Sequence, residues 1–82
     1  MTNVAFSRRI STEVARSLRA ERVRQRLSIS GVARNAGLSH QMVSYVERGM
    51  RNPTLDTLLR IASALNVDLP GLIKRASKTV RR

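Results

Sequence analysis

A short polar helix is predicted between two glycines, in the stretch AGLSHQMVSYVERG at residues 36–49. Val43 and Val46 have helical spacing, so one face is apolar while the other carries hydrogen-bond donors and acceptors. A glutamine can pair bidentately with adenine, and a histidine can donate to guanine or to a phosphate. The polar residues of this stretch are Ser39, His40, Gln41, Ser44 and Tyr45.

No residues in the chain have the spacing of a catalytic or metal-binding site. The five acidic residues are scattered, His40 is the single histidine, and no Gly-rich phosphate loop occurs. Because there is no cysteine, neither disulfides nor thiolate ligands are possible. We therefore predict that the protein is not an enzyme, with no metal, no cofactor and no small-molecule ligand.

Basic residues dominate the composition and concentrate at both ends. The 82 residues hold 16 Lys and Arg against five Asp and Glu, a net charge of +11, and the pI is about 12.0. Residues 1–27 (seven Arg, two Glu) and 69–82 (five basic residues, no acid) each carry +5, whereas residues 28–68 (four Arg, three acids) carry +1. This balance favours a polyanionic partner, nucleic acid first and an acidic membrane surface second; plain solubility is the alternative reading.

The N-terminus lacks the apolar core of a signal peptide. No apolar run approaches the roughly 18 residues of a membrane span. We therefore expect a soluble cytoplasmic protein with no membrane contact, associated with the nucleoid if DNA is its partner.

Apolar periodicity predicts an all-α chain of five helices, and no segment alternates with the period of a strand. The first helix is expected from about Ser11, its cap, to Gln25. Ser28, Ser39 and Thr54 are predicted to cap the second to fourth helices, and Asp68 the fifth. The leucines of the fourth helix and Pro53 are expected in the core. The last eight residues, RASKTVRR, show no periodic apolar face.

Only Gly37-Leu38-Ser39 joins the second and third predicted helices. So tight a turn forces the helices to cross steeply, and Ala33 is small enough to let their backbones approach. In a helix-turn-helix, this geometry pushes the second helix outward so that it can enter a major groove about 12 Å wide. The predicted organisation is a basic N-terminal arm (1–10), a helix-turn-helix domain (11–76, motif about 29–48) and a basic C-terminal tail (77–82).

Three segments resemble the Cro and lambda-repressor type of helix-turn-helix protein, the XRE family. They read LRAERVRQRLS, VARNAGLS and VSYVERGMRNPTLDTLLRIASALNV, in the family's order and spacing, and lie between about Leu18 and Ile73. The resemblance implies a compact five-helix lambda-repressor-like domain that binds double-stranded DNA through its third helix. It also implies a homodimer on a palindromic operator.

The resemblance implies roles for single residues. By position, Ser39 and His40 lie where the family contacts phosphate and the first base. Base readout is implied for His40, Gln41, Ser44 and Tyr45.

Phosphate contacts are implied on both sides of the third helix. The family commonly has a phosphate-binding Gln at the start of its second helix, but Ile29 stands there, so either Ser28 or Ser30 takes that contact or the contact is lost. The other implied phosphate contacts are Ser39, Arg48, Arg51 and Asn52.

Further implied features are structural. Arg22 and Glu47 occupy the positions of a family ion pair between the first and third helices, and Arg26 replaces a glycine that often ends the first helix. The fifth helix has more apolar surface than its own docking needs, which suggests a dimer interface at Leu69, Leu72 and Ile73.

Other readings remain beside these. His40 can be an ordinary exposed side chain, Ser44 can merely permit close approach, and Tyr45 can pack on the second helix. An RNA- or ribosome-associated adaptor would prefer structured RNA, and an antitoxin-type module would bind a toxin and regulate its own gene. We adopt a sequence-specific transcriptional regulator, a repressor, as the working prediction.

Overall fold

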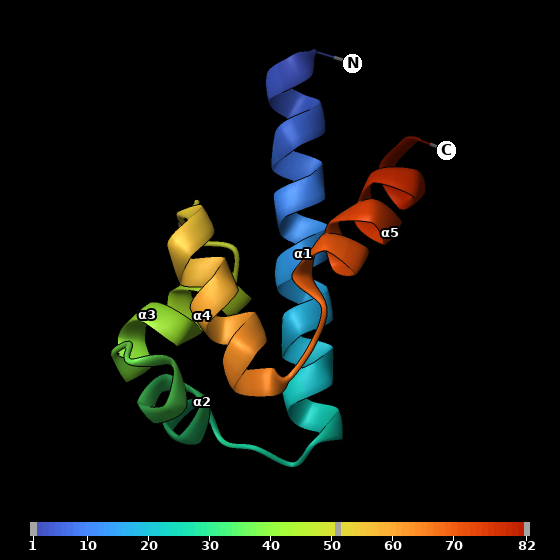
Figure 1. The fold of residues 1–82 in the computed structure, drawn as a ribbon. Coiled ribbons are helices and arrows are strands. Elements are labelled where there is room, and N and C mark those ends of the chain that lie inside the picture. Colours follow the sequence, from blue (N-terminus) through green and yellow to red (C-terminus); the bar gives the residue numbers. More distant parts are fainter. Residues whose placement is uncertain (1, 51, 82) are drawn as a thin grey trace.

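Five α-helices joined by short loops make up residues 2–50 and 52–81, the part of the chain that the computed structural model describes (Figure 1). They are α1 (Asn3–Arg24), α2 (Ile29–Ala36), α3 (His40–Glu47), α4 (Leu55–Leu65) and α5 (Leu69–Arg81). The all-α prediction is confirmed. Within these ranges no helix combines the length and the apolarity that crossing a membrane requires.

Hydroxyl side chains cap four of the helices at their N-termini. Thr2, Ser28, Ser39 and Thr54 each accept the backbone N–H of the residue three positions later, at 2.9 to 3.1 Å. Each bond satisfies a donor that the first helical turn leaves unpaired. The predicted caps of α2, α3 and α4 are therefore confirmed.

The first helix begins earlier than predicted. The cap expected at Ser11 was wrong, because α1 starts at Asn3 and is capped by Thr2. Residues 3–10 contain neither proline nor glycine, and Ile10 packs against the core, so the helix continues through them. Figure 1 shows the first turns of α1 projecting beyond α2, α3 and α4.

The last helix runs further than predicted. α5 continues to Arg81, and Ala76 and Val80 are buried. With Leu69 and Leu72 they form an apolar stripe spaced by three or four residues, which the intervening basic residues concealed in the sequence. The division of the chain into arm, domain and tail stays a prediction.

The core lies where the five helices of the described chain meet. Its most fully buried side chains come from α1 to α4: Val14, Leu18, Val32, Val43, Val46, Ile61 and Leu65.

Not all leucines of α4 belong to this core, so that prediction was wrong. Leu55 and Leu59 are 63% and 48% exposed. The buried face of α4 is centred on Ile61, Ala62 and Leu65, and the two exposed leucines lie at the edge of that face.

Candidate nucleic-acid interface

The turn between α2 and α3 sets the direction of α3. Gly37 has a left-handed backbone (φ +68°), and the Leu38 N–H donates to the Ala33 carbonyl at 2.9 Å. Arg60 of α4 reaches the last turn of α2, where it donates to the Ala36 carbonyl at 3.5 Å. A side chain at Gly37 would stand 3.1 Å from that guanidinium and would also strain the backbone. The turn thus favours glycine.

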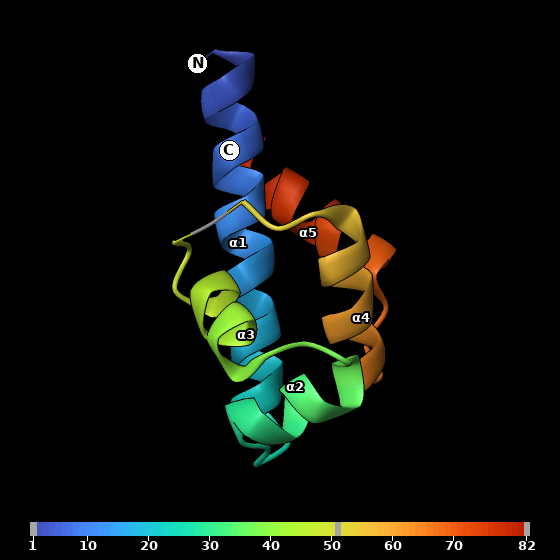
Figure 2. The same cartoon turned by 90° about the vertical axis from the view of Figure 1, so that its left-hand side faces the viewer.

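α3 turns its polar side outward, and Figure 2 views the molecule from that side. Val43 and Val46 are 0% and 1% exposed and fasten the helix to the core. The predicted contact residues lie on the other side, three of them exposed and two partly exposed: Ser39, His40 and Gln41, then Ser44 and Tyr45. We call these five residues the reading face.

Ser30 and His40 meet across the turn. The Ser30 hydroxyl lies 2.8 Å from Nδ1 of the His40 ring, a hydrogen bond between residues of α2 and α3. A hydroxyl that donates to Nδ1 leaves the ring proton on Nε2, which is then a donor. The contact orients the imidazole.

Gln41 and Tyr45 of α3 and Arg48, directly after the helix, form a row. The Gln41 Nε2 donates to the Tyr45 hydroxyl one turn later. The Arg48 guanidinium stands over the Tyr45 ring, 5.5 Å from its centre, within the range of a cation–π interaction. The tyrosine therefore supports side chains on both sides of it.

Arg22 and Glu47 make the ion pair that the resemblance implied. Nε and Nη2 of Arg22 donate to Oε2 and Oε1 of Glu47 at 2.7 and 3.0 Å, and Nη1 donates to the Leu27 carbonyl at 2.8 Å. The two side chains are only 13% and 5% exposed. Hydrogen bonding with Glu47 raises the pKa of Arg22 above its ordinary value, while burial opposes this rise. The pair fastens α3 to α1.

The two departures from the family pattern have different structural outcomes. Ile29, which replaces the glutamine, is partly buried and packs against the core. Arg26, which replaces the glycine, keeps the left-handed conformation (φ +60°) that a glycine would adopt more easily. This corner therefore adopts a conformation that glycine would favour, and it is strained.

The predicted phosphate contacts lie on both sides of the reading face. Ser28 and Ser30 are exposed at the start of α2, whereas Arg48 and Asn52 are exposed after α3. Arg51 lies outside the described residues.

The predicted dimer interface needs correction. Leu69 and Leu72 are 3% and 8% exposed and belong to the core, because they lie on the inner side of α5. Ile73 is 37% exposed. It joins the exposed leucines of α4 in a groove between α4 and α5, here called the α4–α5 groove, whose lining includes Leu55, Leu59, Pro70, Ile73, Lys74 and Lys78.

Sequence reasoning missed the exposed leucines because their spacing is that of a core helix. Only the breadth of the apolar pattern on α4, wider than one buried face needs, could have revealed them. It also missed Arg60, whose role at the end of α2 depends on the tertiary fold. Among the described residues, no three His, Cys, Asp or Glu side chains are grouped to hold a metal ion.

Sequence comparisons with known proteins identify a family and several relatives. The family profile described as helix-turn-helix matches residues 18–72. Control protein C.SmaI of Serratia marcescens is 39% identical over 62 residues, which are 76% of this chain and 74% of that protein. An uncharacterized HTH-type transcriptional regulator of Mycobacterium tuberculosis (strain CDC 1551 / Oshkosh), MT0491, is 39% identical over 59 residues, 72% of this chain.

The chain spans only 42% of the length of this mycobacterial relative. A further HTH-type transcriptional regulator, y4dJ of Sinorhizobium fredii (strain NBRC 101917 / NGR234), is 42% identical over 48 residues, 58% of this chain and 62% of that protein. The family profile covers more than half of the chain and includes α2, α3 and α4 in full. The chain belongs to the XRE-type helix-turn-helix family of DNA-binding regulators.

Proposed function

We propose that the protein is a sequence-specific regulator of transcription that binds double-stranded DNA as a homodimer on a palindromic operator and represses the adjacent gene. The observation that carries the proposal is the reading face of α3, held outward by the Gly37 turn and the Arg22–Glu47 pair. α3 has eight residues and is thus about 12 Å long, which suits a major groove about 12 Å wide. Two relatives are named HTH-type transcriptional regulators, which supports a role in the regulation of transcription.

Gln41 is the principal base reader in this proposal. A side-chain amide has two N–H donors and one carbonyl acceptor. The Tyr45 hydroxyl takes one donor, so the other can donate to adenine N7 while the carbonyl accepts from N6. The pair thus orients the amide in advance without using up its reading capacity.

His40 reads a neighbouring base or its phosphate. With Nδ1 hydrogen-bonded to Ser30, the ring tautomer that carries its proton on Nε2 can donate to guanine N7 or O6. Ser44 and Tyr45 complete the readout at the edge of the helix.

Phosphate contacts flank these base contacts. The oxygens of Ser28 and Ser39 already accept capping N–H groups, but each hydroxyl hydrogen can still be donated to a phosphate. Both residues precede a helix N-terminus, where the backbone dipole favours an anion. Arg48, Arg51 and Asn52 supply contacts from the loop after α3.

The dimer is proposed to form through the α4–α5 groove. Leu55, Leu59 and Ile73 expose apolar side chains there that the described part of the chain leaves uncovered. In Figure 2, α4 and α5 lie to one side of α3, so a second copy in the groove leaves both reading faces open in the same direction. One α3 reads only a few base pairs, and a two-fold pair reads two half-sites about 34 Å apart.

Repression is proposed to follow when the dimer occupies its operator on the DNA. Two copies of α3 in successive major grooves on one face of the duplex exclude other proteins from that face. We therefore propose that the operator overlaps a promoter.

In vitro selection of random duplex DNA by the purified protein tests the proposal. The expected product is a palindrome whose half-sites are separated by one helical turn. Absence of any preferred sequence, together with tighter binding to structured RNA than to duplex DNA, would overturn it.

A further inference from the structure

The projecting start of α1 forms a cleft with the loop that follows α3. Arg8, Ser11 and Thr12 line it on the helix side, and Gly49, Met50 and Asn52 line it on the loop side. A second hollow continues from it along α1, and the two share Arg8, Ser11 and Asn52. We call this continuous hollow the α1 cleft.

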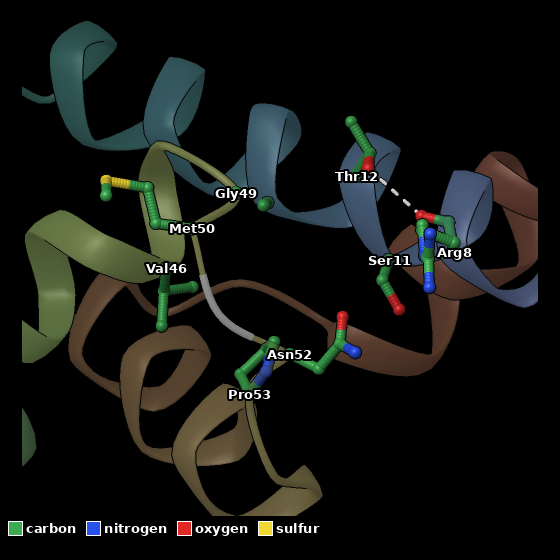
Figure 3. A pocket seen from close by; sticks show the side chains of 9 residues that line it. Arg8, Ser11, Thr12, Val46, Gly49, Met50, Asn52 and Pro53 are labelled. Atoms are coloured by element: carbon green, nitrogen blue, oxygen red, sulfur yellow. Dashed lines mark hydrogen bonds between the residues drawn. The ribbon is translucent and has the colours of Figure 1, made fainter.

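Polar groups face one another across the α1 cleft. Figure 3 shows the Asn52 carboxamide pointing toward Ser11, with the Arg8 side chain beside them. The Thr12 hydroxyl donates to the Arg8 backbone carbonyl at 3.0 Å, and Arg8 lines both hollows of the cleft. None of the described residues that line the cleft is acidic, and the described chain contains no ion pair for Arg8.

The chemistry of these donors suits a phosphodiester. A guanidinium has five N–H donors, an amide has two and a hydroxyl has one, and all can converge on anionic oxygens. A positive cleft without acidic residues attracts an anion and repels a cation.

The position of the α1 cleft identifies which phosphate it can reach. Val46, at the end of α3, and Asn52, a predicted phosphate contact, both line it, so it continues the proposed DNA interface. In Figure 2 the start of α1 extends past the loop on the side away from α2. A duplex held against α3 passes this side with the backbone that flanks the half-site.

We propose that the α1 cleft binds a backbone phosphate outside the half-site, with Arg8 as the main contact and Ser11 and Asn52 beside it. This inference rests on the proposed DNA binding and extends it. Arg8 and Ser11 precede residues 18–72, which match the family, so the contact belongs to the long α1 of this chain.

Duplexes of two lengths test the inference. On the selected site with about six flanking base pairs at each end, Arg8→Ala is expected to weaken binding roughly tenfold per subunit, as for one charge-assisted hydrogen bond. The log–log salt slope should flatten by about one per subunit. On a duplex trimmed to the half-sites, the variant should bind like the wild type.

Arg9→Ala is the matched control, because it makes the same charge change on the next residue, which is not among the residues that line the α1 cleft. Replacing single flanking phosphates by neutral methylphosphonates should weaken the wild type at one position and leave Arg8→Ala unaffected there. Equal losses for the Arg8 and Arg9 variants, or equal losses on both duplexes, would overturn the α1 cleft. A wild-type protein without any sequence preference would instead overturn the proposed function.

Discussion

Arg22 and Glu47 stand 25 positions apart in the chain, and their bidentate ion pair joins the long α1 to α3. A third bond from Arg22 to the Leu27 carbonyl ties in the loop that leads to α2. One arginine thus connects the first helix, the corner after it and the end of α3. The orientation of the reading face depends on this group.

Removing Arg22 is therefore expected to destabilise the domain. Arg22→Ala leaves Glu47 buried without its partner, which lowers the free energy of unfolding by about 3–5 kcal/mol. Urea unfolding followed by circular dichroism measures the loss. Arg24→Ala is the control, because Arg24 pairs with Glu21 on the exposed side of α1 and its removal should change little. Similar small losses in both variants would contradict the assigned role.

The proposed base contact of Gln41 and the proposed phosphate contact of Arg48 can be separated by experiment. Gln41→Ala is expected to weaken the selected site by about 1–3 kcal/mol per half-site while sparing random-sequence binding. Arg48→Ala should weaken all sequences alike and flatten the log–log salt slope by about one per subunit. Fluorescence anisotropy on both kinds of duplex, at several salt concentrations, measures these effects. If both variants lose specific and random-sequence affinity in the same ratio, α3 is not the reading helix.

Ser30 is expected to act through His40. Ser30→Ala frees the imidazole to rotate, so discrimination at the base pair beneath His40 should fall by about 1 kcal/mol. His40→Ala should remove the same discrimination, and the double variant should lose little more than His40→Ala alone. Binding to duplexes changed at that base pair provides the measurement. Ser63→Ala, an exposed serine on α4, is the control. Fully additive losses would mean that the two residues act separately.

The sequence predicted the middle of the fold better than its ends. α2, α3 and α4 have strong caps and clear stops at Gly37 or a short loop, so local chemistry determines their bounds. The start of α1 depends on the absence of a breaker, and the end of α5 on burial of Ala76 and Val80, which only the tertiary fold supplies. The predicted start of α1 and the predicted end of α5 were wrong for this reason.

The candidate site was likewise predictable from the sequence only where local periodicity determines it. The outward face of α3 follows from its periodicity, because two valines on one side require polar residues on the other. The Ser30–His40 contact joins residues ten positions apart through the angle of the turn. The exposure of Leu59 depends on how α4 rotates against the core. Neither can be read from local spacing.

The α4–α5 groove is expected to control dimerisation. Leu59→Lys places a charge on an apolar side chain that is 48% exposed, so the monomer should fold while self-association is lost. Sedimentation equilibrium measures this, and Val23→Lys, at a 57% exposed position on α1, is the control. Because Lys74 and Lys78 line the groove, added salt should strengthen association of the free wild-type protein by screening their repulsion. Equal weakening by both variants would place the interface elsewhere.

The left-handed Arg26 is expected to cost stability and to supply charge near DNA. The left-handed conformation costs a residue other than glycine about 1–2 kcal/mol of folding free energy, and a glycine avoids this cost. Glycine also has more conformational freedom in the unfolded chain, which offsets about 0.5–1 kcal/mol of that benefit. Arg26→Gly should therefore raise the free energy of unfolding by roughly 0.5–1 kcal/mol. Asn66→Gly is the matched control, because Asn66 has nearly the same φ (+57°) and asparagine tolerates it, so the gain should be smaller.

Strain retained at an exposed corner two residues before Ser28 is the basis for our prediction that the arginine serves the proposed DNA interface. Measured without DNA, Arg26→Gly should be the more stable protein. Measured with DNA, it should bind every sequence more weakly and show a flatter salt dependence, because one phosphate contact per subunit is lost. Unchanged binding alongside higher stability would mean that the charge of Arg26 does not act on DNA, and the strain would then have no role in the interface.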